Sequence, residues 1–484
     1  MLIDYYQRTM LNLIVVLIAL FIYTLFIYLI SYINNINLLY VTLLNFLSYV
    51  LFAPLFVDLI KTGKINLLQP IYIVNGTFYL YFVFKPWMDL LLNLKYYFGM
   101  NLFPYLPLAT FYVIIGIVML ELGYYSNINV SSFIKKFSKI NSQKNDSNRA
   151  IKYAVFLLLI GSTLFYLYTR MMDMSFIALI TFNLFNTSPI RFVSSSIQQS
   201  NPFINYLYSS QYLLASSFAI LYAFQKKRRF LLLPLFLIIF ALFATIGFRY
   251  ILVVMIVFLV FYRYLKKNEI PKLKDIFFLI LIIFLMFLVV GGIGAMRGFL
   301  RSGNLTNVRD VLNLETIWNE FGYNLNIYQP FYAMIVNIPK YHNYTYGFTY
   351  YLAIVQPIPR GLWHNKPAGI PNLGSAIFGG NPQPSESGQA YPIIGDFYIN
   401  FGLIGIIILM SLFGLSLKIL WKYLEIYKYN NWVKIIFSLS SGYLVQLVSR
   451  GWPPQILTEL FFLIFPIIFG QWLTNRFSFR TKNL

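Results

Sequence analysis

Long apolar runs separated by short polar segments make up most of the chain. A membrane-spanning helix needs roughly 20 mostly apolar residues, and twelve segments fit this pattern. They lie at 11–33, 37–60, 66–84, 103–125, 153–172, 204–224, 230–247, 249–264, 275–296, 394–417, 435–450 and 455–473. The first run is too long for the apolar part of a signal peptide and lacks a small-residue cleavage site, so we expect a retained helix. The pattern predicts an all-α polytopic membrane protein with about 12 transmembrane helices.

The apolar stretch 230–262 is the one whose division into spans needs an argument. As one helix it would be roughly 50 Å long, against a hydrocarbon core of roughly 30 Å. The basic clusters on its two sides, 225–229 and 263–267, both have the character of cytoplasmic segments, which requires an even number of crossings. Two short spans with a turn at 246–250 satisfy both conditions.

Composition excludes a soluble protein, because 59% of the residues are hydrophobic and only 11% are charged. The net charge of +22 could indicate a nucleic-acid partner. The positive residues, however, lie in short clusters between apolar runs, as in chains whose charges set membrane topology. Cysteine is absent, so neither a disulfide nor a thiol nucleophile is available.

The type of positive residue differs between the two sides of the predicted membrane. With both termini in the cytoplasm, the cytoplasmic segments hold 25 of the 37 Lys and Arg residues, and 18 of these are Lys. Eight of the 12 outer ones are Arg: Arg170, Arg191, Arg249, Arg297, Arg301, Arg309, Arg360 and Arg450. The guanidinium fork matches pairs of phosphate oxygens, which the lysine ammonium cannot do. We therefore predict outer arginines that bind phosphate; the alternative is interfacial anchors that reach towards headgroups.

One outer connection, 297–393, is too long for an idle loop. It divides the chain into an N-terminal bundle (1–296, about nine spans), a large extracytoplasmic loop or lid, and a C-terminal bundle (394–484, about three spans). The aromatic part, 315–338, predicts an amphipathic helix lying on or near the bilayer. The part after it is rich in proline and glycine, which favours a substrate-binding loop without regular structure.

Several kinds of chemistry have no support in the sequence. No D-x-D or H-x-x-x-H spacing indicates a metal site, and no G-x-x-x-x-G-K-[ST] motif indicates ATP-driven transport, so we predict neither metal nor cofactor. Most acids near the spans fall close to span ends, as at Asp58, Glu121, Asp396 and Glu459. Ion-coupled carriers place charges inside the bundle, so this distribution disfavours a transporter.

A cationic and aromatic outer surface fits a lipid-linked saccharide, which combines phosphate at the membrane face with sugar rings. Outside the cytoplasm the glycosyl donor would be a polyprenyl diphosphate, because no nucleotide sugars are present there. Arginines can stabilise the charge on such a leaving group without a metal. A further side chain must take the proton from the attacking hydroxyl.

Four short motifs resemble those of a known family. They are P-R-x-x-W-x-x-K-P (Pro359, Arg360, Trp363, Lys366, Pro367), the small-residue stretch before NFGLIG (400–405), a G-x-R turn (Gly247, Arg249) and S-R-G at 449–451. Together with the layout of the spans, they resemble the O-antigen polymerase family, the Wzy-type oligosaccharide repeat-unit polymerases.

The resemblance implies a metal-independent membrane glycosyltransferase of the broad GT-C class in the bacterial inner membrane. Such an enzyme moves a growing chain from undecaprenyl diphosphate onto the next lipid-linked repeat unit, building O-antigen, capsule or a similar polysaccharide. The implied partners are the undecaprenyl-diphosphate-linked oligosaccharide, membrane lipid and, as a candidate, a chain-length regulator; nucleic acid is not among them. In this family the outer arginines bind the donor diphosphate.

The candidate site residues follow from charge and position. Those for binding the diphosphate and substrate are Arg191, Arg249, Arg297, Arg301, Arg360, Arg450, Lys366 and Trp363. Two residues compete as the base: Glu386 is a carboxylate in a Ser/Gly/Pro-rich loop, and His364 has the better intrinsic pKa but lies among cations. Arg450 has an alternative role as the ion-pair partner of Glu459.

Three rival functions stay open on this sequence. An O-antigen ligase would share the fold and the arginines and differ only in its acceptor. A flippase for the same lipid-linked units would line a central cavity with charge and does not need so large an outer loop. The third rival is a structural scaffold without chemistry.

Overall fold

The computed structural model describes most of the chain. The described residues are 2–34, 36–97, 99–137, 147–171, 204–225, 229–246, 249–271, 275, 292, 322, 325–358, 362–363, 365–367 and 390–478, with the backbone alone at 2–13, 204–205, 229, 241–246, 249–250 and 475–478. The predicted span 275–296 lies almost entirely outside these residues.

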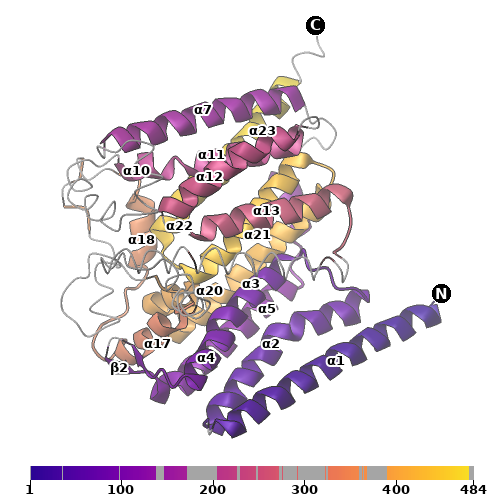
Figure 1. Cartoon of the computed structure of the whole chain (residues 1–484), viewed down its shortest axis with the longest axis vertical. Coiled ribbons are helices and arrows are strands. Elements are labelled where there is room, and N and C mark those ends of the chain that lie inside the picture. Colours follow the sequence, from indigo (N-terminus) through magenta and orange to yellow (C-terminus); the bar gives the residue numbers. More distant parts are fainter. Residues whose placement is uncertain are drawn as a thin grey trace, which may run out of the picture.

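The described chain is almost wholly helical (Figure 1). In chain order its elements are α1 (Leu2–Ile33), α2 (Leu38–Thr62), α3 (Pro70–Tyr79), the π-helical η1 (Leu80–Phe84), α4 (Lys85–Leu91), β1 (Tyr96–Tyr97), β2 (Met100–Asn101), the 3-10 turn η2 (Phe103–Tyr105), α5 (Leu106–Tyr125), α6 (Val130–Phe137), α7 (Ser147–Met171), α10 (Ile204–Ser209), α11 (Tyr212–Phe224), the 3-10 turn η3 (Arg229–Leu231), α12 (Leu232–Ile246), α13 (Arg249–Lys267), α17 (Tyr328–Asn337), α18 (Phe348–Val355), α20 (Ile393–Ile426), α21 (Asn431–Ser449), α22 (Pro453–Leu463) and α23 (Phe465–Ser478).

Seven helical stretches of the described chain are long and apolar enough to cross a membrane. They are Ile14–Ile33, Leu38–Thr62, Phe103–Tyr125, Ser147–Met171, Ile393–Ile426, Asn431–Ser449 and Pro453–Thr474. These stretches make the chain a multi-pass helical membrane protein. The other predicted spans within the described residues are also helical, although shorter or interrupted, as in α3–η1–α4 and α10–α11. Where the turn was predicted at 246–250, α12 ends at Ile246 and α13 begins at Arg249; residues 247–248 lie outside the described residues.

Three local predictions need correction. α20 continues to Ile426, so the connection to α21 is only four residues long, because Leu417 and Leu424 keep the apolar face of the helix in contact with its neighbours. The segment after 84 continues as α4 before the small β1–β2 hairpin. α17 is not the amphipathic helix predicted within 315–338: nearly all its side chains are buried, since it packs against α5 and α20.

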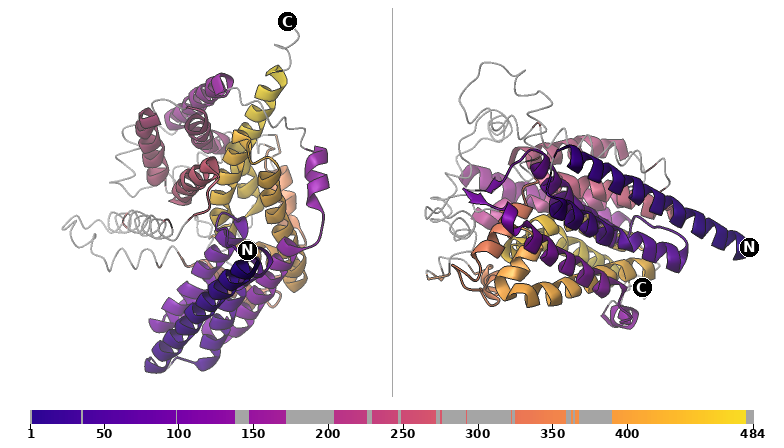
Figure 2. Two further views of the ribbon diagram at one scale, coloured as in Figure 1. Left: turned by 90° about the vertical axis from the view of Figure 1, so that its right-hand side faces the viewer. Right: turned by 90° about the horizontal axis from the view of Figure 1, so that it is seen from below.

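The buried side chains form two main cores. The first is built mainly from α2, α3, α4, α5, α17 and α20. The second is built from α7, α11, α12, α13 and the C-terminal helices α21 to α23. Figure 2 shows the corresponding indigo-purple and magenta groups of helices, with the yellow C-terminal helices next to both. α21 packs along α13 and also contacts α3 and α20, so it joins the two groups.

Glycines allow α5 and α20 to touch through their backbones. A Cβ atom on Gly414 would lie 1.9 Å from the carbonyl oxygen of Leu120, and one on Gly123 would lie 2.0 Å from that of Ser411. Neither position has room for a side chain. This contact fixes the inner part of α20 against α5 and leaves its N-terminal part to form the site described next.

Candidate functional site

Segments from the predicted outer connections gather at one end of the bundle. α10, α17, α18 and the β1–β2 hairpin lie at this end, and the N-terminus of the chain lies at the opposite one (Figure 1). We call it the loop end and define it by α10 and residues 92–97, 99–102, 325–358, 362–363, 365–367, 390–392 and 450–452. Lys366, Trp363 and Arg450 all belong to it, so three of the predicted site residues share one end of the molecule.

Arg450 occupies the turn between α21 and α22, directly against the start of α20. The backbone N–H of Gly451 donates to the carbonyl oxygen of Tyr391 at 2.7 Å. A Cβ atom on Gly451 would lie 2.6 Å from the Cα of Ile393, so this close approach requires glycine. The N-termini of α20 and α22 therefore lie side by side, and their partial positive charges add to that of half-buried Arg450. The arrangement favours an anion.

Glu459 is a buried acid within electrostatic reach of Arg450. Its carboxylate accepts hydrogen bonds from Tyr212 Oη (2.8 Å), Tyr443 Oη (2.7 Å), Gln455 Nε2 (2.8 Å) and Gln446 Nε2. All four partners come from different residues, and together they fix the position of this side chain. Arg450 interacts with Glu459 electrostatically, which supports the alternative that Arg450 is the partner of Glu459. The four hydrogen-bond donors to Glu459 are neutral tyrosine and glutamine side chains.

Lys366 closes the loop that carries the P-R-x-x-W-x-x-K-P motif. Its Nζ donates to the carbonyl oxygens of Gln356 (2.9 Å) and Ile358 (3.0 Å). Tyr206 Oη of α10 donates to the same Gln356 oxygen at 2.8 Å. Lys366 therefore has a structural role in addition to its predicted one. Trp363 is half-buried beside it.

The remaining predicted site residues fall outside the described side chains. Arg249 is the first residue of α13, where the backbone alone is described. Glu386, His364, Arg191, Arg297, Arg301 and Arg360 lie outside the described residues. Over the described part of the chain, no group of three or more His, Asp or Glu side chains is placed to hold a metal ion.

A break in α20, which the sequence reasoning missed, organises another part of the loop end. Gly402 has φ 63° and ψ −147°, a conformation outside the helical region. Such a break leaves carbonyl oxygens of the preceding turn without helical partners. The backbone N–H of Thr345 donates to the oxygen of Ile399 (2.9 Å), and that of Tyr346 donates to the oxygen of Asn400 (3.1 Å). The segment before α18 thus docks on the broken helix.

The side chain of Asn400 fastens this docking. Its Oδ1 accepts from Gly347 N (3.0 Å) and Thr345 Oγ1 (2.8 Å), and its Nδ2 donates to Thr349 Oγ1 and to the Asp396 carbonyl oxygen, both at 2.7 Å. Asn400, Asp396 and Thr349 are all fully buried. The signals present in the sequence were the NFGLIG stretch and an acid near a span end.

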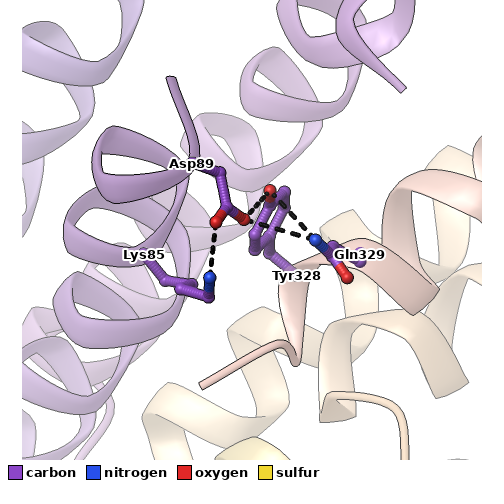
Figure 3. A network of polar contacts seen from close by, with 4 residues as sticks. All are labelled: Lys85, Asp89, Tyr328 and Gln329. Atoms are coloured by element: carbon purple, nitrogen blue, oxygen red, sulfur yellow. Dashed lines mark hydrogen bonds and ion pairs between the residues drawn. The ribbon is translucent and has the colours of Figure 1, made fainter. Parts of the chain in front are cut away.

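A second buried network joins α4 to α17 (Figure 3). Lys85 Nζ and Asp89 Oδ1 are 2.5 Å apart, with both residues at most 4% exposed. Asp89 Oδ2 accepts from Tyr328 Oη (2.5 Å) and Gln329 Nε2 (3.2 Å). Burial, followed by the Asp89 carboxylate, raises the pKa of Tyr328 well above its ordinary value, so its phenol keeps the proton that it donates. The network fixes the first described helix of the large loop.

The fold and the loop end define a multi-pass helical membrane protein with a cationic, hydrogen-bonded site at one end of the bundle. The model of the family described as O-antigen polysaccharide polymerase Wzy matches residues 12–474, nearly the whole chain, so the protein belongs to this family. No curated protein and no solved structure gave a significant match. Family membership confirms the resemblance drawn from the motifs and implies a polymerase with glycosyltransferase-like activity.

Proposed function

We propose that this protein polymerises undecaprenyl-diphosphate-linked oligosaccharide repeat units into a surface polysaccharide, on the extracytoplasmic face of the bacterial inner membrane and without a divalent metal. The observation that carries the proposal is the seat of Arg450. Arg450 lies in the turn beside the N-termini of α20 and α22, at the end of the bundle that holds α17 and α18, and its positive charge matches the charge of a lipid diphosphate.

The reaction needs positive charge and one base. The acceptor hydroxyl oxygen forms a bond to the anomeric carbon of the donor as the bond from that carbon to the diphosphate oxygen breaks. Undecaprenyl diphosphate leaves with the electron pair, and Glu386 or His364 takes the hydroxyl proton. Arg450 and Arg360, with the other outer arginines and Lys366, stabilise the departing diphosphate. Trp363 offers a ring face to a sugar.

The predicted topology places this chemistry outside the cytoplasm. The N-terminus lies at the opposite end of the bundle from the loop end, as expected for cytoplasmic termini. The loop 297–393 acts as the lid between the N-terminal and C-terminal bundles, in a GT-C-like arrangement of about 12 spans. A chain-length regulator is the further protein partner that we propose.

The test uses purified protein and a synthetic polyprenyl-diphosphate repeat unit, with and without a chelator. We expect oligomers of many repeat units under both conditions. Arg450→Ala should abolish them, and Arg450→Lys should restore them only in part, because a point charge cannot grip two phosphate oxygens. Lys340→Ala removes an exposed cation of the loop end and serves as the matched control, with normal products.

Three outcomes contradict the proposal in different ways. Loss of products in the chelator overturns the metal-free reaction. Transfer of preformed chains to another acceptor, without oligomers, indicates a ligase. Substrate that crosses the bilayer of a vesicle without reacting indicates a flippase.

A further inference from the structure

α18 bridges two parts of the loop end. Its N-terminus is tied to the break in α20, since Thr349 in its first turn hydrogen-bonds to Asn400 and Asp396. Its C-terminus, Val355, leads directly into residues 356–358, where the Gln356 carbonyl oxygen accepts from Lys366 Nζ and Tyr206 Oη. The helix is only eight residues long, so a shift at one end is carried to the other.

Along its length α18 packs against α22, the helix that begins just after Arg450. Ala353 and Val355 are buried, whereas Ile354 on the other side is 74% exposed. α18 therefore sets where residues 356–358 and Lys366 lie relative to the Arg450 turn. We call the hydrogen bonds of residues 345–349 to Asn400 and Asp396 the tie. Without the tie, α18 would be attached to the rest of the protein mainly through its short buried face.

Every hydrogen-bonding group of the Asn400 side chain, which is part of the tie, has a partner. Asn400 has two donor hydrogens and one acceptor oxygen, and all of them are used. The Thr349 hydroxyl accepts from Asn400 and donates to Asp396 Oδ2 (3.4 Å). Gly347, just before α18, has φ 86°, a left-handed conformation that favours glycine, and its N–H points to Asn400 Oδ1. A buried cluster with every partner in place selects one arrangement of the elements that it joins.

We propose that Asn400 and Thr349 are positioning residues for the donor diphosphate: they fix α18 and thereby hold residues 356–358, and Lys366 bonded to them, at the correct distance from Arg450. The proposal rests on the proposed function, because it names what that site needs in order to bind its donor. Neither residue touches the substrate. Both act by keeping the enzyme in its binding-competent form.

The first experiment compares threonine variants in the polymerisation assay. Thr349→Val removes the hydroxyl and keeps the shape, Thr349→Ser keeps the hydroxyl, and Asn400→Ala removes the bonds of the tie to the Asn400 side chain. Thr110→Val is the matched control, because Thr110 is equally buried and its hydroxyl bonds to Tyr332 of α17, away from α18. A competent form of reduced population raises the apparent KM by that factor and leaves kcat unchanged at saturation.

We expect KM for the lipid-linked unit to rise roughly threefold or more in Thr349→Val, and further in Asn400→Ala, with kcat retained. Thr349→Ser should restore the parent KM. A loss that is merely structural lowers the amount of active enzyme and leaves KM unchanged, as we expect for Thr110→Val. The proposal is overturned if KM stays within about twofold of the parent in both Thr349→Val and Asn400→Ala.

The second experiment does not depend on activity and uses the absence of cysteine from the chain. Val355→Cys places one thiol on the buried face of α18, and its labelling by a maleimide reports how often that face opens. Adding Thr349→Val should speed labelling roughly tenfold, the change expected when one buried hydrogen bond is lost. Adding Thr110→Val should not.

The two experiments separate the inference from the proposed function. Faster labelling in a protein whose parent form makes no oligomers refutes the proposed function and with it the role in donor binding. Equal labelling rates with and without Thr349→Val, in a protein that polymerises, refute the positioning role alone.

Discussion

Replacing Gly402 by alanine tests what holds the break in α20. The glycine has φ 63° and ψ −147°, a region that residues with a side chain rarely adopt. Forcing such a conformation costs about 1–3 kcal/mol. The new Cβ would also lie 2.9 Å from Tyr344 Oη and 3.0 Å from its Cζ. Pressing the ring aside adds about 1–3 kcal/mol, so we expect a total loss of roughly 2–6 kcal/mol in the free energy of unfolding.

The assay is a denaturant titration of the purified protein in mixed micelles, which gives the free energy of unfolding. Gly76→Ala is the control, since Gly76 lies within α3 and a Cβ there meets nothing within 4 Å. That change should be neutral or stabilise the helix by up to about 1 kcal/mol. Combining Gly402→Ala with Tyr344→Phe, which removes the nearest atom, should recover part of the steric cost. If Gly402→Ala is as stable as Gly76→Ala, the account of the break is refuted.

Two further predictions concern topology and the network of Figure 3. Leu362, 81% exposed at the loop end, and Tyr429, 66% exposed between α20 and α21, are single sites for cysteine in the cysteine-free chain. In intact cells an impermeant maleimide should label Leu362→Cys and not Tyr429→Cys; the reverse result would invert the topology and place the site in the cytosol. Lys85→Met leaves Asp89 buried without its cation and should cost about 3–5 kcal/mol of unfolding free energy. The double variant with Asp89→Leu should be less destabilised than Lys85→Met, and equal or greater loss would contradict a buried ion pair.

Apolar periodicity was sufficient to predict most helices, because a bilayer imposes one length and one composition on each crossing. It also predicted two short helices in place of one at 230–262, which α12 and α13 confirm. It failed at α17, whose aromatic residues have the composition of an interfacial helix. Burial there depends on contacts with α5 and α20, far away in sequence, and no local pattern encodes them.

Charge type was the signal in the sequence that singled out Arg450. The structure puts Arg450 at the loop end, and its role in anion binding stays a prediction. The tie at Asn400 was missed because an asparagine and two threonines have no distinctive pattern in sequence. These residues meet only because the break at Gly402 lets the segment 345–349 dock beside Asn400. Lys366 was predicted as a phosphate ligand. In addition, the structure shows its Nζ donating hydrogen bonds to two backbone carbonyl oxygens of the loop.

Two contacts of α20, one with α5 and one with the start of α18, together fix the rotation of this helix about its axis. Near its inner end Gly414 must face the backbone of α5, and near its outer end Asn400 must face the start of α18. Each residue added to a helix turns everything beyond it by about 100°. Insertion or deletion of a single residue between 402 and 414 would therefore turn one contact away from its partner whenever the other is kept. The length of this stretch is constrained as strictly as the identity of the residues at its two ends.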